Sequence, residues 1–165
     1  MNVGGMPLRP LAAAPGRDAV VVIDQRALPH RLQFATLASP QDVYTAIRDM
    51  WVRGAPLIGA VAAYGLALQA RVDASDATLA ASVAHLQSAR PTAVNLAWAL
   101  QRMLPALLAL PPAQREAAAW NEAGAIADED VQVNAAIGRH GLPLLQAMAA
   151  RKPGPVNVLT HCNAG

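Results

Sequence analysis

The sequence MWVRGAPLIGAVAAYG, residues 50–65, decides how the rest of this chain is organised. Gly54 allows a tight turn of the backbone, and Pro56 suits the first turn of a helix, where its missing N–H would have no partner anyway. From Pro56 onward, large aliphatic residues alternate with alanine and glycine, which is typical of a buried helix packed closely against its neighbours. We therefore predict a core helix over residues 56–70.

The start of this helix is a candidate anion site. The first N–H groups of a helix have no partner within the helix, and the positive charge of Arg53 lies next to them in the sequence. A sugar phosphate or a carboxylate would fit such a site. The alternative is an arginine on an ordinary loop before a core helix, and the spacing alone leaves both interpretations open.

Composition and charge argue against several classes of protein. With 54% hydrophobic residues, a chain of 165 residues is expected to bury one sizeable core. The net charge is only +2 and the basic residues are scattered, which argues against a nucleic-acid partner. The single cysteine excludes an intrachain disulfide and fits a reducing cytoplasm. The apolar run of residues 57–68 is shorter than the roughly 20 residues of a membrane span, so no membrane partner is expected.

Most of the chain is predicted to be helical, with a small sheet near its beginning. Residues 1–18 are expected to form a flexible tail, and residues 19–150 a domain in which AVVVID (residues 19–24) and HRLQFATL (residues 30–37) make a small antiparallel hairpin or meander. The further helices are predicted from Ser39-Pro40 to about Met50, from Ser75-Asp76 to about Arg90, over residues 92–110 with a kink at Pro105, over residues 113–139, and over residues 142–150 after a break or bend at Gly138 and Gly141.

The last residues are typical of the opening of another domain. Residues 151–155 are a linker by composition, and the apolar stretch VNVLT (residues 156–160) is predicted to be a strand. It runs into His161-Cys162-Asn163-Ala164-Gly165. A strand followed by a turn that carries site residues is how a βαβ unit begins. We therefore expect the sequence to be truncated at a domain junction.

Four stretches together resemble the methylthioribose-1-phosphate isomerases of the methionine salvage pathway. They are DQRALP (residues 24–29), VRGAP (52–56) continuing to AYG (63–65), RPTAVNL (90–96) and LTHCNAG (159–165). Their order and spacing match that family from about residue 19 onward. The wider family includes ribose-1,5-bisphosphate isomerase and the regulatory subunits of the translation-initiation exchange factor, and the RPTAVN and THCN runs favour the methylthioribose branch.

This resemblance implies a fold and a setting. The expected fold is an α+β N-terminal domain, mostly helical with a small antiparallel β-sheet. A Rossmann-like α/β domain would follow it; residues 156–165 would be its first strand and turn, and the rest would be absent. The resemblance also implies that the complete protein is a cytoplasmic homodimer that needs no metal or organic cofactor. Its active site would lie between the two domains.

The resemblance also implies roles for individual residues. Arg53, Gly54, Ala55 and, separately, Arg90 would contact a sugar-phosphate substrate at its phosphate, and Cys162 would be the catalytic cysteine. A guanidinium and helix-start amides suit a phosphate, and a thiol near a turn suits proton exchange. The full enzyme would be an aldose–ketose isomerase that converts 5-methylthioribose 1-phosphate to 5-methylthioribulose 1-phosphate. The family's catalytic aspartate and a substrate-binding lysine fall beyond Gly165, so residues 1–165 alone are expected to be inactive.

Alternatives to these roles remain open. By itself, Cys162 could be an inert buried thiol, Arg90 a charge at a helix terminus, and His161 either a site residue or a structural one. The histidines His30, His85 and His140 share no metal-like spacing with Cys162 and are interpreted as structural or exposed. The acidic run of residues 128–130 (Asp128, Glu129 and Asp130) is interpreted as part of a solvated helix face, and the tryptophans Trp51, Trp98 and Trp120 as core or interface residues.

A second class of function is a non-catalytic module of the same family that binds a sugar phosphate or a protein. The retention of Cys162 together with both arginines favours the isomerase.

Overall fold

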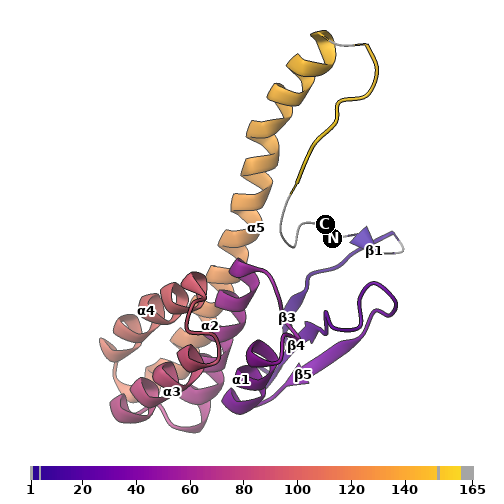
Figure 1. The fold of residues 1–165 in the computed structure, drawn as a ribbon. Helices are drawn as coiled ribbons and strands as arrows, with labels where there is room; N and C mark the ends of the chain where they lie inside the picture. The colour runs from indigo at the N-terminus through magenta and orange to yellow at the C-terminus, as the bar shows by residue number, and fades with distance from the viewer. Residues whose placement is uncertain (1, 4, 152, 161–165) are drawn as a thin grey trace. The chain divides into compact units, whose positions relative to one another are not determined.

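In the computed structural model, which describes residues 2–3, 5–151 and 153–160, the chain forms two compact units, Met1–Ile126 and Ala127–Gly165. The first unit holds strands β1 to β5, helices α1 to α4 and the beginning of helix α5 (Figure 1). The second unit holds the remainder of α5 and the residues that follow it.

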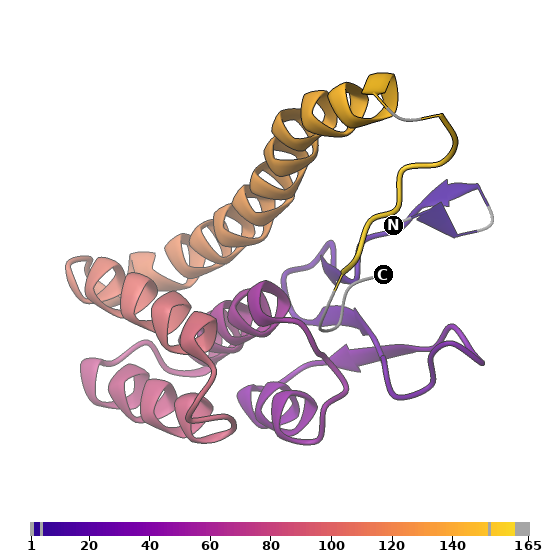
Figure 2. The same cartoon turned by 45° about the horizontal axis from the view of Figure 1, so that its top comes forward.

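A three-stranded antiparallel sheet lies on one side of helices α1 to α4 (Figures 1 and 2). Its strands are β3 (Leu11–Ala13), β4 (Val20–Ile23) and β5 (Phe34–Leu37), with β4 in the middle. Val20 pairs with Leu37 and Ile23 with Phe34, which confirms the predicted hairpin. The short strands β1 (Asn2–Val3) and β2 (Met6–Pro7) form a separate antiparallel pair.

Strand β3 differs from the flexible tail expected for residues 1–18. Its Leu11 is buried and pairs with Val22 of β4. The Pro-Gly pair at residues 15–16, which suggested a loose segment, instead lies in a tight turn, where the N–H of Arg17 donates to the carbonyl of Ala14 at 2.9 Å. Arg17 has φ 51° in this turn. The residues that prevent a helix here therefore join β3 to β4.

Helices α1 to α4 begin and end close to the predicted positions. They are α1 (Pro40–Arg48), α2 (Ala55–Val72), α3 (Asp76–Ser88) and α4 (Val94–Leu108), and Pro105 lies inside α4. Ser39 and Ser75 cap α1 and α3 by accepting hydrogen bonds from the N–H groups of Asp42 and Thr78. Because serine is a preferred N-cap residue, both starts could be predicted from the sequence.

Helix α2 lies at the centre of the helical core and contacts α1, α3 and α4. Two glycines permit this close packing: a Cβ atom added at Gly59 would lie 2.7 Å from the main-chain oxygen of Asn95 in α4, and one at Gly65 would lie 2.8 Å from a methyl carbon of Val43 in α1. By length and composition alone α2 could cross a membrane, but 67% of it is buried inside the protein. Its role in the core accounts for its apolar composition.

The beginning of α5 (Pro112–Arg151) is fastened to the rest of the first unit by Arg115, whose side chain is only 5% exposed. The Arg115 guanidinium donates to the carbonyl of Leu110 at 2.8 Å and to that of Ala74 at 2.7 Å. It also donates to the carboxylate of Asp76 at 2.6 Å. One side chain therefore joins the segment after α4, the segment before α3 and the first turn of α5.

Helix α5 continues from Pro112 to Arg151, so the predicted division into two helices, residues 113–139 and 142–150, is wrong. A glycine inside a helix costs about 1 kcal/mol relative to alanine, and a proline such as Pro143 costs about 3 kcal/mol. Most residues around them are strong helix formers, such as alanine, leucine, glutamine and methionine. The local preference of these neighbours therefore outweighs the three unfavourable positions.

The second unit leaves large apolar side chains of α5 exposed. They are Val131, Val133, Ile137, Leu142, Leu144, Leu145 and Met148. Residues 155–160 have no regular secondary structure, and Leu159 is 99% exposed. The strand predicted for residues 156–160 is therefore not formed here, because no other strand pairs with it among the described residues.

Candidate functional site

The loop that carries Arg53 lies beside the segment that follows β4. The N–H of Gln25 donates to the carbonyl of Trp51 at 2.8 Å. The Nη2 atom of Arg53 donates to the carbonyl of Gln25 at 2.9 Å, and the Nε2 atom of Gln25 donates to the carbonyl of Arg53 at 3.2 Å. The stretches DQR and WVR, distant in sequence, are thus connected through both main-chain and side-chain groups.

A second set of contacts holds the same loop. The Arg26 guanidinium pairs with the Asp24 carboxylate at 2.6 Å and lies over the Trp51 ring, 4.6 Å from its centroid. The hydrogen bond from the Arg26 side chain holds the pKa of Asp24 below its ordinary value. Asp24 is therefore a carboxylate at neutral pH, which keeps Arg26 in place against Trp51.

Helix α2 begins without a side-chain cap. Its N-cap residue is Gly54, with φ 101°, a conformation that favours glycine, and a Cβ atom there would meet open space. Ala55 and Pro56 in the first turn are exposed. The start of α2 is therefore exposed next to Arg53, an arrangement that an anion site would need and that an ordinary loop also allows.

The predicted substrate contact at Arg90 belongs to the start of α4. Arg90 is half-buried in the turn between α3 and α4, where its carbonyl accepts the N–H of Ala93 at 3.0 Å. Helix α4 likewise begins without a side-chain cap, with Ala93 as its N-cap residue. Because Asn95 in its first turn packs against Gly59 of α2, the structure brings the early turns of the two helices together.

The four N-caps of α1 to α4 differ in a way that bears on function. Ser39 and Ser75 satisfy N–H groups of α1 and α3, whereas α2 and α4 have no such side chain and each follows shortly after an arginine. Unpaired helix-start N–H groups and a guanidinium suit a phosphate or carboxylate. No described contact tests whether Arg53, Gly54, Ala55 or Arg90 binds one, so these roles stay predictions.

Cys162, the predicted catalytic residue, lies outside the described residues, as does His161.

The histidines and tryptophans considered above differ in exposure. His30, His85 and His140 are exposed, and the ring of His85 stacks on that of Tyr44 with centroids 4.2 Å apart. Trp120 is buried, Trp51 half-buried and Trp98 47% exposed. Across the described part of the chain, no group of three or more His, Cys, Asp and Glu residues could hold a metal ion.

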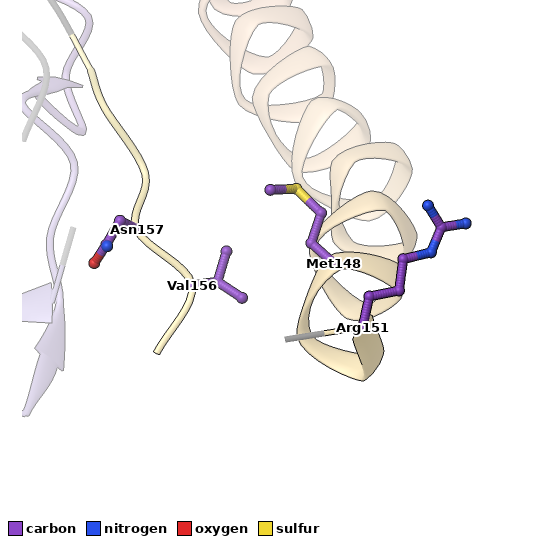
Figure 3. Close-up of a pocket in the computed structure, with 4 residues that line it drawn as sticks. All are labelled: Met148, Arg151, Val156 and Asn157. Atoms are coloured by element: carbon purple, nitrogen blue, oxygen red, sulfur yellow. The ribbon is translucent and has the colours of Figure 1, made fainter. Parts of the chain in front are cut away.

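A cavity of about 290 Å³ lies within the second unit (Figure 3). It is lined by Met148, Arg151, Val156 and Asn157. Figure 3 shows Met148 and Val156 between α5 and the segment that follows it, while the Asn157 side chain is directed away from the helix. This cavity is mainly apolar and contains none of the predicted site residues.

Two residues, Gln25 and Arg115, join distant segments within the first unit, and the sequence does not indicate these contacts. Gln25 lies within the DQRALP stretch, but nothing in that stretch indicates that its partner is 28 positions further along. Arg115 lies in an ordinary amphipathic pattern, and its partner Asp76 is 39 positions away. Local sequence carries no signal for such long-range pairs.

The architecture and the helix starts together define a class: a mostly helical α+β domain whose predicted substrate contacts lie at two helix starts. The chain belongs to the Initiation factor 2 subunit family, which matches residues 51–165. The α+β fold class with a small antiparallel sheet and the family resemblance are therefore both confirmed.

Individual relatives make the similarity more specific. The chain is 52% identical, over 165 residues, to methylthioribose-1-phosphate isomerase from Cereibacter sphaeroides (strain KD131 / KCTC 12085), covering 100% of this chain and 45% of that protein. The crystal structure of 5-methylthioribose 1-phosphate isomerase from Pyrococcus horikoshii OT3 matches with a TM-score of 0.74 and 34% identity, covering 81% of this chain and 39% of that one.

A second solved structure has a different name. The translation initiation factor eIF-2B subunit delta from A. fulgidus matches with a TM-score of 0.69 and 35% identity, covering 76% of this chain and 38% of that one. The chain thus spans less than half the length of each of these three proteins.

Proposed function

We propose that this chain is the N-terminal part of an aldose–ketose isomerase that converts 5-methylthioribose 1-phosphate to 5-methylthioribulose 1-phosphate. The observation that carries the proposal is the pair of helix starts at α2 and α4. Both lack a side-chain cap, both follow an arginine, and they pack together where Asn95 meets Gly59. The names of the Cereibacter sphaeroides and Pyrococcus horikoshii relatives support the same substrate.

Each predicted residue then has a chemical role. Arg53 and Arg90, with the main-chain N–H groups at Gly54 and Ala55, bind the phosphate. The reaction opens the sugar ring and moves hydrogen from C2 to C1, which makes it an intramolecular oxidoreduction. Cys162 exchanges a proton or donates a hydrogen bond to a sugar oxygen as charge develops there.

The proposal includes a setting for the complete enzyme. It is a cytoplasmic homodimer whose partner molecule is a small sugar phosphate rather than nucleic acid or a membrane. The scattered basic residues argue against nucleic acid and the single cysteine fits a cytoplasmic location, whereas the homodimer is what the family resemblance implies. Residues 1–165 alone do not turn over substrate, because the catalytic aspartate and the lysine implied by the resemblance are not among them. Catalysis requires all of these groups to be held around the substrate in one geometry.

A chimera tests the proposal directly. Residues 1–165 replace the aligned part of the Cereibacter sphaeroides relative, and conversion of 5-methylthioribose 1-phosphate is measured beside the unaltered relative and beside residues 1–165 alone. We expect turnover from the chimera and none from residues 1–165. A chimera that is folded and soluble but inactive, while the unaltered relative is active, would contradict the proposal.

Variants of the chimera test the individual roles. Arg53→Ala or Arg90→Ala removes a charge-assisted contact, so KM should rise by roughly 10- to 150-fold, which corresponds to about 1.5–3 kcal/mol. Cys162→Ser should lower kcat at least about 100-fold if the thiol transfers a proton. Unchanged KM in both arginine variants would refute the phosphate contacts, and wild-type kcat in Cys162→Ser would reduce Cys162 to a packing residue.

The second candidate is a non-catalytic module that holds a sugar phosphate or a protein. The match to a translation initiation factor subunit favours it. It predicts that the chimera binds the sugar phosphate through Arg53 and Arg90 without converting it, so the turnover assay separates the two candidates.

A further inference from the structure

Gln25 makes two different hydrogen bonds to one residue, Arg53. Its side-chain amide donates to the carbonyl of Arg53 at 3.2 Å, and its main-chain carbonyl accepts from the Arg53 guanidinium at 2.9 Å. A third bond, from the N–H of Gln25 to the carbonyl of Trp51 at 2.8 Å, aligns the two segments. Gln25 therefore fixes both the main chain and the side chain of Arg53.

These bonds leave much of the Arg53 guanidinium available. An arginine has five N–H donors, of which Gln25 receives one at Nη2. The Nε atom is buried and has no hydrogen-bond acceptor among the residues that the structure describes. A buried donor without an acceptor is costly, so an acceptor that reached Nε would stabilise the loop.

The main chain that Gln25 fixes leads directly into the helix start. Arg53 precedes Gly54, the N-cap residue of α2, whose φ of 101° sets the direction in which the helix begins. The amide of Gln25 holds the peptide between these two residues through the carbonyl of Arg53. Loss of this amide would free the peptide from which the Arg53 side chain extends, and the bond from the guanidinium to the main-chain carbonyl of Gln25 would then be the remaining side-chain bond between the two residues.

We propose that Gln25 is a positioning residue that holds Arg53 in one orientation for a phosphate bound at the start of α2. This inference rests on the proposed function and extends it to a residue that does not itself contact the ligand. It acts through Arg53, so its effect on phosphate binding disappears when the Arg53 side chain is absent.

The experiment uses residues 1–165, inorganic phosphate as the probe, and four variants. They are Gln25→Ala, Arg53→Ala, the double variant, and the control Gln33→Ala, which alters an exposed glutamine on the neighbouring segment. The first measurement is the heteronuclear NOE of the Arg53 Nε–H group, identified by its loss in Arg53→Ala. We expect a rigid group in the wild type and in Gln33→Ala, and a mobile one in Gln25→Ala.

The second measurement is the phosphate Kd of each variant. We expect Gln25→Ala to raise Kd about three- to tenfold when Arg53 is present and to leave it unchanged when Arg53 is alanine, since residues that act as a unit are not additive. Gln25→Met keeps the side-chain length and removes the donor, so it gives the same comparison if Gln25→Ala does not fold.

Three results would each overturn the inference: an unchanged NOE in Gln25→Ala, an equal loss of phosphate affinity with and without Arg53, or no phosphate binding by the wild type. Failure of the proposed function is a separate result. An inactive chimera, together with phosphate binding that depends on Gln25 through Arg53, would refute the isomerase and leave the positioning role standing.

Discussion

Replacement of Arg115 by methionine should destabilise the first unit strongly. Methionine keeps an unbranched side chain and a high helix propensity, so the main loss is the guanidinium. In the structure that group is almost entirely buried and joins the segments beside α3, α4 and α5. No local property of the sequence around Arg115 would suggest this sensitivity.

The expected loss can be calculated from the bonds. The contacts to the carbonyls of Leu110 and Ala74, at 2.8 and 2.7 Å, are charge-assisted and contribute about 1.5 kcal/mol each or more. The contact to Asp76 contributes at most about 1 kcal/mol, because the Asp76 side chain is 73% exposed and becomes hydrated when its partner is lost. We therefore expect a decrease in the free energy of unfolding of about 3 kcal/mol.

Urea unfolding monitored by tryptophan fluorescence measures this decrease. The three tryptophans, Trp51, Trp98 and Trp120, all belong to the first unit, so the signal reports that unit alone. For a slope of about 2 kcal/mol per molar urea, the midpoint should fall by about 1.5 M.

Asp76→Asn is the matched control for this prediction. It removes the charge of Asp76, whose side chain is 73% exposed, and leaves the two carbonyl contacts of Arg115, so its effect should stay below about 1 kcal/mol. If Arg115→Met lowered the midpoint no further than Asp76→Asn does, the carbonyl contacts would carry no weight and the reasoning would be refuted.

Two further predictions concern packing and pH. Gly59→Ala places a Cβ atom 2.7 Å from the main-chain oxygen of Asn95 and should lower the free energy of unfolding in urea by about 1–3 kcal/mol. The control Gly124→Ala, whose Cβ atom would have its nearest neighbour at 3.7 Å, should be neutral or stabilising by up to about 1 kcal/mol. Equal effects of the two substitutions would contradict the close approach of α2 and α4. Hydrogen bonding to Arg26 lowers the pKa of Asp24, so its stabilisation is present above about pH 4 and is lost as the pH falls through the lowered value. Asp24→Asn should flatten this acid-induced loss in midpoint measurements, and an unchanged acid limb would exclude Asp24 as its source.

The parts of the fold that could be predicted are those with local signals. Ser39 before Pro40 and Ser75 before Asp76 indicate helix starts through side-chain caps, and the β-branched run that contains β4 indicates a strand. The sequence does not predict strand β3, because a Pro-Gly pair is compatible both with a loose segment and with a turn between strands. The continuity of α5 is not evident from its local signals, because Gly138, Gly141 and Pro143 each disfavour a helix although the helix continues through all three.

The candidate site was predictable only in part. The RGAP and RPTAVN stretches identify Arg53 and Arg90, and the structure adds that the helices they precede meet at Gly59. The hydrogen bonds of Gln25 could not be predicted, because they join segments 28 positions apart through a main-chain carbonyl and an amide that any loop could provide. Residue spacing predicts single helices and strands, whereas the loop that carries Arg53 is held by Gln25, which is distant in sequence.

The central place of α2 has a consequence for synthesis of the chain on the ribosome. This apolar helix is made before α3 and α4, which cover it, and the end of α4 follows about 36 residues after the end of α2. At roughly 5–20 residues per second, that interval lasts about 2–7 s. Throughout that interval an apolar helix long enough to cross a membrane lacks the complete α4, and until Ser88 is made it lacks the complete α3 as well. The nascent chain therefore presents α2 to chaperones and to targeting factors before the core can close around it.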